Sequence, residues 1–489
     1  MKGKIQVKDE KIMSKKTKWV ILGACFLTLV STGTIYACSM VYPNDETASI
    51  EEPTAIQLPV AIASGAPARD YYVSPEGNDT NPGTVNEPLV SIQKAIDSVE
   101  PGGTVYLLEG SYRQTVRIAK SGSQAQGYIT LRNAEGQTAI LDGTGVQLVA
   151  DGAIHIDNAS YVRVEGLEIS HYRTDSADIT PIGIRVSGGG SNIEISGNRI
   201  NDIGTDAGHG KGGGNAHGIA VYGNTATPLQ HLAIIQNELY NLKLGASEAM
   251  AINGNVDGFR ILQNTVHDNN NIGIDVIGFE GTAPNPDQDQ ARNGMIAENY
   301  VYNISSFGNP AYGNEYSAAG IYVDGGKNIT IMNNDVHDND YGIELASEHA
   351  GGLTTEVEVS LNRIYHNRAA GITLGGYDES RGGTSDCIIK ENELIENNSH
   401  HLGYGEINFA FDTRNNELRN NSIRANEDGL MITNEFPQNE GNTVDFNQYI
   451  SKEQAHWIWK GEIFDDFSMY QIQTGNDLNS DLSIISSGK

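Results

Sequence analysis

Three acidic residues, Asp275, Asp324 and Glu344, fall at related positions of a short repeated phrase in the middle of the chain. The phrase is glycine, apolar residue, any residue, apolar residue. Asp275 and Glu344 occupy its third position, as Tyr322 does in a copy between them, and Asp324 lies two residues beyond Tyr322. If copies stack as parallel strands, rungs lie about 4.8 Å apart and alternate residues about 6.6 Å apart.

This spacing predicts Cα separations of about 8 Å both from Asp324 to Glu344 and from Asp275 to Asp324. Paired carboxylates in that range suit glycosidic-bond hydrolysis, in which one donates a proton and the other acts as base or nucleophile. Whether such a reaction would retain or invert the configuration stays open. The competing interpretation is that outward acids on an acidic chain are simply solvated.

Further residues near this cluster are candidates for substrate binding. Tyr322 would stack on a sugar ring or pack against a loop. The other candidates are Arg185, Glu348, His349 and Phe279. We expect that no cofactor is required. Glu280, Asp287 and Asp289 are candidates for binding Ca²⁺.

The phrase recurs along the chain and predicts the elements that hold these residues. It begins at Gly183, Gly218, Gly273, Gly320, Gly342, Gly371 and Gly429, with degenerate copies near Ala249 and Gly405. The shortest interval is the one of 22 residues from Gly320 to Gly342. Units of three short strands cannot bury their apolar faces alone, so they stack. The sequence predicts an all-β parallel β-helix of about ten coils, right-handed because parallel crossovers are.

A second phrase places asparagines at equivalent positions after each copy. They are Asn198, Asn237, Asn264, Asn299, Asn334, Asn362, Asn392 and Asn421. We predict that they form a stacked amide ladder at a turn, with a structural role. Cys387 falls at an inward position, so we interpret it as a small buried apolar residue.

Long insertions mark where a solenoid carries function. The coil from Gly273 to Gly320 has one insertion just after its first strand, at 278–292, and another just before the next copy of the phrase, at 304–317. Two more, at 204–215 and 347–356, flank other copies. They predict two walls of a cleft over the strand that carries the acids.

The ends of the solenoid require caps, because an open end exposes apolar edges. Residues 91–99 have helical spacing and would cover the first coil, and the aromatic-rich segment 457–475 would close the last one. The predicted organisation is export signal 1–38, tether 39–69, N-terminal cap and first strands 70–150, coils 151–450, and C-terminal cap and tail 451–489.

The N-terminal segment predicts export. Lysines precede an apolar, charge-free run from Trp19 to Cys38, and Ile35 to Cys38 fits a bacterial lipobox. The alternatives are a lipoprotein anchored through Cys38, a secreted protein with a cleaved signal, and an uncleaved anchor. The membrane would be contacted only through this lipid or anchor.

The net charge is −30 over 489 residues. Nucleic acids and anionic membrane surfaces are excluded as partners, because both require a basic field. We expect a monomer that acts on an extracellular polysaccharide or oligosaccharide.

Residues 71–116, which begin YYVSPEGNDTNPGT and contain SIQKAIDSVEPGGTVYLLEG, closely resemble the N-terminal module of bacterial right-handed β-helix proteins of the pectin-lyase-like superfamily. The resemblance extends over about residues 70–475. It implies an exported carbohydrate-active enzyme with a substrate groove along one stacked strand. Recognisable calcium-binding aspartates with a catalytic Lys or Arg, as in pectate lyases, do not appear.

Three functions follow as hypotheses. The first is a glycoside hydrolase that uses Asp324 and Glu344, with Asp275 as a third carboxylate. The second is a Ca²⁺-dependent polysaccharide lyase. Such an enzyme needs a basic proton acceptor, and Arg185 is the only cation at the outward-facing third position of the repeated phrase. The third is a non-catalytic glycan-binding surface protein.

Overall fold

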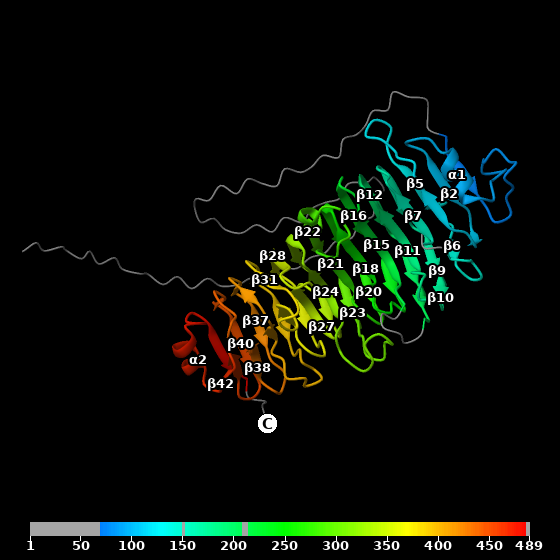
Figure 1. Cartoon of the computed structure of the whole chain (residues 1–489). Helices are drawn as coiled ribbons and strands as arrows, with labels where there is room; N and C mark the ends of the chain where they lie inside the picture. The colour runs from blue at the N-terminus through cyan, green and yellow to red at the C-terminus, as the bar shows by residue number, and fades with distance from the viewer. Residues whose placement is uncertain (1–68, 149–151, 208–213, 486–489) are drawn as a thin grey trace, which may run out of the picture. The chain divides into compact units, whose positions relative to one another are not determined.

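The computed structural model describes residues 69–148, 152–207 and 214–485 of the chain. The predicted export signal, Cys38 and nearly all of the tether lie outside the described residues. Within them, three long β-sheets are formed by strands between β1 and β43 (Figure 1). In each sheet the strands follow one another in chain order. Successive coils each give one strand to each sheet, so the architecture is a parallel β-helix.

The sheet that carries the predicted acids is called the cleft sheet here. Its strands pair in parallel except for the last pair, β41 and β42. They are β4 (Val116–Ile118), β7 (Ile154–Asp157), β11 (Ile182–Ser187), β15 (His217–Gly223), β18 (Met250–Gly254), β21 (Ile274–Ile277), β24 (Ala319–Asp324), β27 (Tyr341–Ala346), β30 (Ile372–Leu374), β34 (Ile407–Phe409), β38 (Leu430–Asn434), β41 (His456–Trp459) and β42 (Glu462–Phe464).

A second sheet follows the cleft sheet along each coil. It contains β1 (Tyr71–Val73), β2 (Thr104–Leu107), β5 (Ile129–Asn133), β8 (Val162–Glu165), β12 (Gly190–Ser196), β16 (Leu229–Ile235), β19 (Val256–Leu262), β22 (Arg292–Ala297), β25 (Lys327–Met332), β28 (Leu353–Ser360), β32 (Ile388–Lys390), β36 (Glu417–Arg419) and β39 (Thr443–Asp445), with β31 (Gly383–Ser385) and β35 (Thr413–Arg414) as a side branch.

The third sheet completes the coils. It contains β3 (Gly110–Tyr112), β6 (Ala139–Asp142), β9 (Glu168–Ser170), β13 (Arg199–Asn201), β17 (Glu238–Tyr240), β20 (Thr265–His267), β23 (Tyr300–Tyr302), β26 (Asp335–His337), β29 (Arg363–Tyr365), β33 (Glu393–Ile395), β37 (Ser422–Arg424), β40 (Gln448–Ser451) and β43 (Asp481–Ile484). A short pair, β10 (Arg173–Thr174) and β14 (Gly204–Thr205), lies apart from these sheets.

The cleft sheet and the third sheet each have 13 strands among the described residues, more than the about ten coils expected. The difference arises because strands without the repeated phrase join the cleft sheet at both ends: β4 and β7 come before Gly183, and β41 and its antiparallel partner β42 follow the last copy. The register aligns the third position of the repeated phrase from coil to coil, as the predicted stacking requires. The successive partners at this position are Arg185, Ala220, Ala251, Asp275, Tyr322, Glu344, Thr373 and Asn408.

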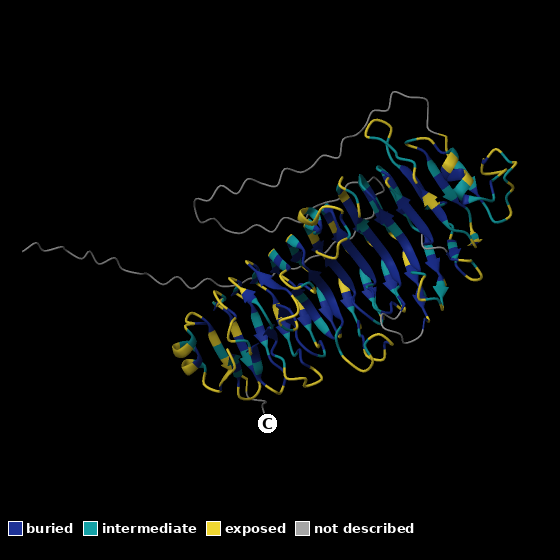
Figure 2. Ribbon diagram, in the orientation of Figure 1, coloured by how far each residue is buried: buried dark blue, intermediate teal, exposed yellow. Residues whose placement is uncertain are grey.

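The interior is a continuous apolar stack. Ile321, Val323, Ile329 and Ile331 are at most 1% exposed, as their period of two predicts. Figure 2 shows buried residues following the strands and exposed ones in the loops. Cys387 is also fully buried, and burial raises the pKa of its thiol to about 12, so the thiolate needed for reactivity does not form at neutral pH.

The glycine of the repeated phrase is required by the close approach of neighbouring coils. A Cβ on Gly273 would lie 2.5 Å from the carbonyl oxygen of Gly320, and one on Gly342 would lie 2.4 Å from that of Gly371. Any larger residue would push the coils apart at the start of the cleft-sheet strands.

The predicted asparagine ladder is present. Asn237 Nδ2 and its backbone N–H both donate to Asn264 Oδ1, at 3.0 and 2.9 Å, and each ladder asparagine repeats this pattern with the next. The ladder joins all eight predicted residues and extends to Asn447. A second ladder, through Asn339, Asn367 and Asn397, was not predicted and ends on the carboxyl of Glu406.

Two helices flank the coils. Helix α1 (Ile92–Ser98) is capped by the Ser91 side chain and buries the predicted apolar face against β1, β2 and β4. Helix α2 (Phe467–Thr474) lies at the other end, where Tyr470 stacks on Trp457. No helix within the described residues is both long enough and apolar enough to cross a membrane.

Candidate active site

Two cavities open over the outer face of the cleft sheet. The larger, of about 640 Å³, lies over β24 to β38 and is called the main cavity. The smaller, of about 260 Å³, lies over β15 to β21 and is called the side cavity. Predicted insertions contribute to the walls: residues 312 and 315–317 line the main cavity on one side, and residues 347–348 line it on the other.

Glu344 provides the carboxyl on the floor of the main cavity, at the third position of β27 that the repeat predicts. Tyr322 lines the same cavity one rung earlier and is 6% exposed. Burial raises the pKa of Glu344 to about 8, and the nearby charges of Glu348 and Asp324 add to this shift. The side chain is therefore a protonated acid at neutral pH, able to give a proton to a bound ligand.

Asp324 lies beside this floor but is not among the residues that line either cavity. It is 3% exposed, and its Oδ1 accepts a hydrogen bond from the backbone N–H of Glu348 at 2.6 Å. Burial raises its pKa to about 8, partly offset by that hydrogen bond. Asp324 thus fixes the turn that carries Glu348, and at neutral pH it is not an anionic base.

Glu348 is the exposed carboxylate of the main cavity. Its Oε2 pairs with Arg381 Nη1 at 3.3 Å, and the same guanidinium nitrogen donates to the Glu348 carbonyl oxygen at 3.1 Å. Arg381 comes from the loop after β30 and also lines the cavity. The main cavity therefore holds a buried acid and an ion-paired carboxylate that are four residues apart in the chain.

Asp275 lies on the rung between Ala251 of the side cavity and Tyr322 of the main cavity, and it lines neither cavity. It is 3% exposed, and its Oδ1 has no hydrogen-bond partner among the described residues. Burial raises its pKa well above the ordinary value, and the neighbouring charges of Glu248 and Asp324 act in the same direction. The predicted clustering of Asp275, Asp324 and Glu344 is thus realised, but loops cover the cluster.

Tyrosines form much of the remaining wall of the main cavity. Tyr341 and Tyr404 meet edge to face with ring centroids 5.7 Å apart, and Tyr316 stacks on Phe307 at 4.9 Å. Tyr377 is 84% exposed at the rim. Such rings offer apolar faces to sugars and polar hydroxyls at their edges.

Several sequence candidates lie elsewhere. Phe279 lines neither cavity, since its ring packs where side chains on Gly325 and Gly352 would otherwise stand. Arg185 lies over the ring of Tyr222, with its guanidinium carbon 5.6 Å from the ring centroid. His349 follows Glu348 and is not among the lining residues.

The candidate calcium ligands make hydrogen bonds within the loops or are exposed. Asp289 accepts hydrogen bonds from the backbone N–H groups of Gly281 and Ala283, which fixes the insertion. Glu280 accepts from Asn253, and Asp287 is exposed in the short 3-10 helix Pro286–Gln288. Among the residues that the structure describes, no group of three or more His, Cys, Asp or Glu side chains is arranged to hold a metal ion.

Sequence reasoning missed residues that stand directly before the glycine of the repeated phrase. His217, Glu248, Ile272, Tyr341 and Tyr404 hold this position in different copies, and all of them line a cavity. The signal was present as a third column of the repeat. Arg381 carries no such signal, because it comes from a loop outside the repeat.

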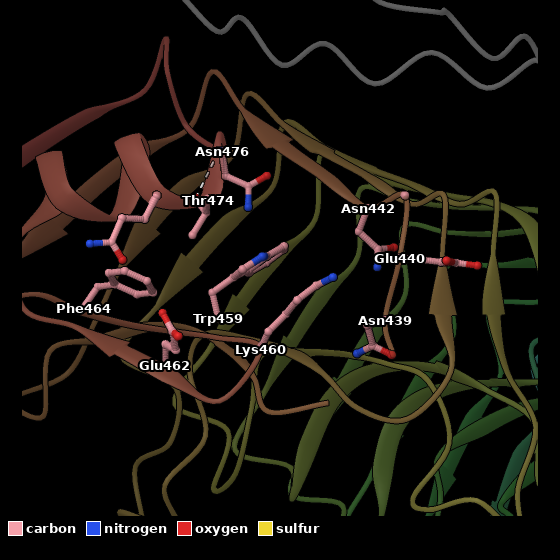
Figure 3. Close-up of a pocket in the computed structure, with 11 residues that line it drawn as sticks. Asn439, Glu440, Asn442, Trp459, Lys460, Glu462, Phe464, Thr474 and Asn476 are labelled. Atoms are coloured by element: carbon pink, nitrogen blue, oxygen red, sulfur yellow. Dashed lines mark hydrogen bonds between the residues drawn. The ribbon is translucent and has the colours of Figure 1, made fainter. Parts of the chain in front are cut away.

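A third cavity, of about 470 Å³, lies at the C-terminal end and is shown in Figure 3. Trp459 and Phe464 of the β41–β42 hairpin, residues 439–442 and the end of α2 enclose it. Trp459 follows the inward residues Phe409 and Asn434 in register, so this space belongs to the packing of the last coil.

The fold and the acidic cleft define the class: a β-helix with buried carboxyls under long loops. The model of the family described as Pel9A-like, right-handed β-helix region, matches residues 71–273, and the model described as right-handed β-helix region matches residues 211–394 and 319–463. The chain therefore belongs to the right-handed β-helix family, as the pectin-lyase-like resemblance predicted.

The curated relatives include the uncharacterized protein YwoF of Bacillus subtilis (strain 168), which is 43% identical over 416 residues, covering 84% of this chain and 87% of that protein. Pectate lyase PEL9 of Emericella nidulans is 40% identical over 115 residues, covering 21% of this chain and 28% of that enzyme. Among solved structures, the GH136 lacto-N-biosidase of Eubacterium ramulus covers 85% of this chain and 68% of its own, with 16% identity and a TM-score of 0.55, which shows a shared fold.

Proposed function

We propose that the protein is a carbohydrate-active enzyme that hydrolyses a glycosidic bond in the main cavity. The observation that carries this proposal is Glu344, a partly buried carboxylic acid on the floor of a cavity walled by tyrosines, whose pKa is raised to about 8. The cavity has the size of an ordinary ligand site, about 300–1,000 Å³.

In the proposed reaction, Glu344 gives its proton to the glycosidic oxygen as the bond from that oxygen to the anomeric carbon breaks. The Glu348 carboxylate, held by Arg381, faces the resulting positive charge. It either attacks the anomeric carbon or takes a proton from an attacking water. Water supplies the hydroxyl group of the new reducing end.

This assignment gives Glu348 the part that the sequence suggested for Asp324. The reason is access and charge: Glu348 lines the cavity as an anion, whereas Asp324 is covered and protonated at neutral pH. Asp324 then acts as a positioning residue through the Glu348 backbone N–H.

A second candidate is a polysaccharide lyase, which the similarity to pectate lyase PEL9 over 21% of the chain favours. A lyase abstracts a proton beside the uronate carboxyl and leaves an unsaturated product. Arg381 is the cation of the main cavity that such a reaction would use, although it is paired with Glu348.

The test incubates the purified protein with neutral and uronic-acid polysaccharides, each with added Ca²⁺ or with EDTA. Reducing ends and the ultraviolet absorbance of unsaturated products are followed together. We expect reducing ends without absorbance, at equal rates in Ca²⁺ and EDTA. Absorbance that rises with the reducing ends would establish the lyase, and silence in both signals would favour a glycan-binding protein.

A further inference from the structure

The side cavity is a second polar site on the cleft sheet. Glu248, Asn253 and Glu280 line it, together with His217 and Tyr222. No lysine or arginine is among its lining residues, and Arg185 lies over the ring of Tyr222 instead. At about 260 Å³ it is smaller than an ordinary ligand pocket and of a size for a single small ring.

The polar groups of the side cavity are held in place by one another. Tyr222 Oη lies 3.2 Å from His217 Nε2, and His217 Nδ1 donates to the carbonyl oxygen of Glu248 at 3.0 Å. Burial lowers the pKa of His217 to about 4, so the imidazole is neutral and the Nδ1 proton fixes its tautomer. Burial raises the pKa of Glu248 to about 8, so this carboxyl is a hydrogen-bond donor at neutral pH.

Asn253 has a buried hydrogen-bond acceptor that a ligand could satisfy. Its Nδ2 donates to Glu280 Oε2 at 2.6 Å, while its Oδ1 has no partner among the described residues although the side chain is only 3% exposed. A buried amide oxygen without a donor costs about 1–3 kcal/mol. A hydroxyl group that donates to this oxygen would remove that cost.

The side cavity and the main cavity lie on one line. Ala251, on the floor of the side cavity, is followed in register by Asp275, Tyr322 and Glu344. Three rungs span about 14 Å. The alanine side chains at Ala220 and Ala251 leave room at this end of the column, whereas Tyr322 fills the column beside Glu344.

We propose that the side cavity binds one uncharged sugar residue of a glycan that also occupies the main cavity at Glu344. The inference rests on the proposed function for the identity of the ligand as a glycan. A uronate carboxylate would meet the Glu280 carboxylate, and none of the described residues that line the side cavity is a lysine or arginine. The carboxyl group of Glu248 and the amide of Asn253 match sugar hydroxyls instead.

The test uses the variant Glu344→Gln, so that ligands are bound without being cleaved. Its affinity is measured for neutral, uronic-acid and amino-sugar oligosaccharides, from disaccharides to hexasaccharides. Ala246→Trp is then added to block the rim of the side cavity, and Ala226→Trp, an exposed alanine in the loop after β15, is the matched control. Asn253→Ala tests the same site without adding bulk.

We expect Ala246→Trp and Asn253→Ala each to weaken binding of long neutral oligosaccharides by about tenfold or more, because both remove contacts in the side cavity. Disaccharides and the Ala226→Trp control should be unaffected. Uronic-acid oligosaccharides that bind as tightly as neutral ones, unchanged binding in both cavity variants, or no binding to any oligosaccharide would overturn the inference. Cleavage by the wild-type protein is assayed separately, so hydrolysis without an effect of the cavity variants would refute this inference and leave the proposed function intact.

Discussion

At the scale of single residues, burial separates the acids of the cleft into different roles. Glu344 and Glu348 both line the main cavity, yet Glu344 is covered enough to keep its proton, whereas Glu348 is ion-paired with Arg381. An environment that raises the pKa of one carboxyl group next to an ion-paired second one is typical of the general acid in an enzyme that uses two carboxyl groups.

Replacing Glu344 with Gln should lower the rate of glycan hydrolysis about 10²–10⁴-fold, the range over which a general acid contributes. The amide is of similar size and has no proton to give, so glycan affinity should be kept. Reducing ends measure the rate, and calorimetric titration measures the affinity.

The matched control is Glu393→Gln, which removes an exposed carboxylate of β33 on another sheet and should leave the rate unchanged. A Glu344→Gln protein that folds and hydrolyses at the wild-type rate would rule out Glu344 as the proton donor.

The pH dependence of hydrolysis should show a fall in rate as pH rises through about 8, because Glu344 must be protonated to act and burial holds its pKa there. The measurement is kcat/KM across neutral and mildly alkaline pH, because this ratio reports ionisations of the free enzyme. A rate that keeps rising above that pH would contradict the role of Glu344.

At the scale of elements, the repeat made much of the fold predictable. The period of two placed Ile321 and Val323 inside, the phrase gave the register that aligns Asp275 with Tyr322 and Glu344, and equivalent asparagines gave the ladder. These features depend on residues a fixed distance apart, which a sequence displays directly.

The loops were less predictable, for a physical reason. Whether an outward acid is solvated or covered depends on how insertions fold over it, and no periodicity describes an insertion. The sequence therefore gave no indication that Asp324 would bind the Glu348 backbone N–H or that Arg381 would reach the same site. Phe279, a candidate for sugar binding, is 36% exposed and lies against Gly325 and Gly352, outside both cavities.

The asparagine ladder should be a major source of stability. In Asn334→Ala, the backbone N–H and Nδ2 of Asn299 lose their acceptor, and the Ile296 carbonyl oxygen loses its donor. Because these groups are buried, we expect a loss of about 2–4 kcal/mol in the free energy of unfolding. Urea denaturation followed by circular dichroism measures it.

Asn86→Ala provides the comparison, since Asn86 is exposed in a loop and should change stability by less than about 0.5 kcal/mol. Equal stabilities for the two variants would show that the ladder bonds contribute no more than a surface asparagine.

At the scale of the whole molecule, stacking buries carboxyl groups as well as apolar side chains. Glu406 ends the second ladder and is 1% exposed, and burial raises its pKa to about 8, against the hydrogen bonds from Asn397. Between pH 4.5, the ordinary pKa of this group, and about pH 8, Glu406 therefore keeps a proton in the folded protein that it has lost in the unfolded chain.

The stability of the protein should consequently fall as pH rises from about 5 to 8. One such group changes the free energy of unfolding by about 1.4 kcal/mol per pH unit. Glu406→Gln removes one titrating group, so its unfolding free energy should fall less steeply over this range than that of the wild type. The comparison is made by urea denaturation at several pH values, and identical slopes would show that Glu406 does not keep its proton in the folded protein.

The central claim is that the cleft hydrolyses a glycan. Its most direct test is digestion of a neutral glycan in water enriched in heavy oxygen, with mass spectrometry of the products. Hydrolysis predicts that each cleavage places one oxygen atom from water in a saturated product, and that Glu344→Gln abolishes this signal. Products that lack the heavy oxygen and carry an unsaturated ring would contradict the claim, because elimination forms them without adding water.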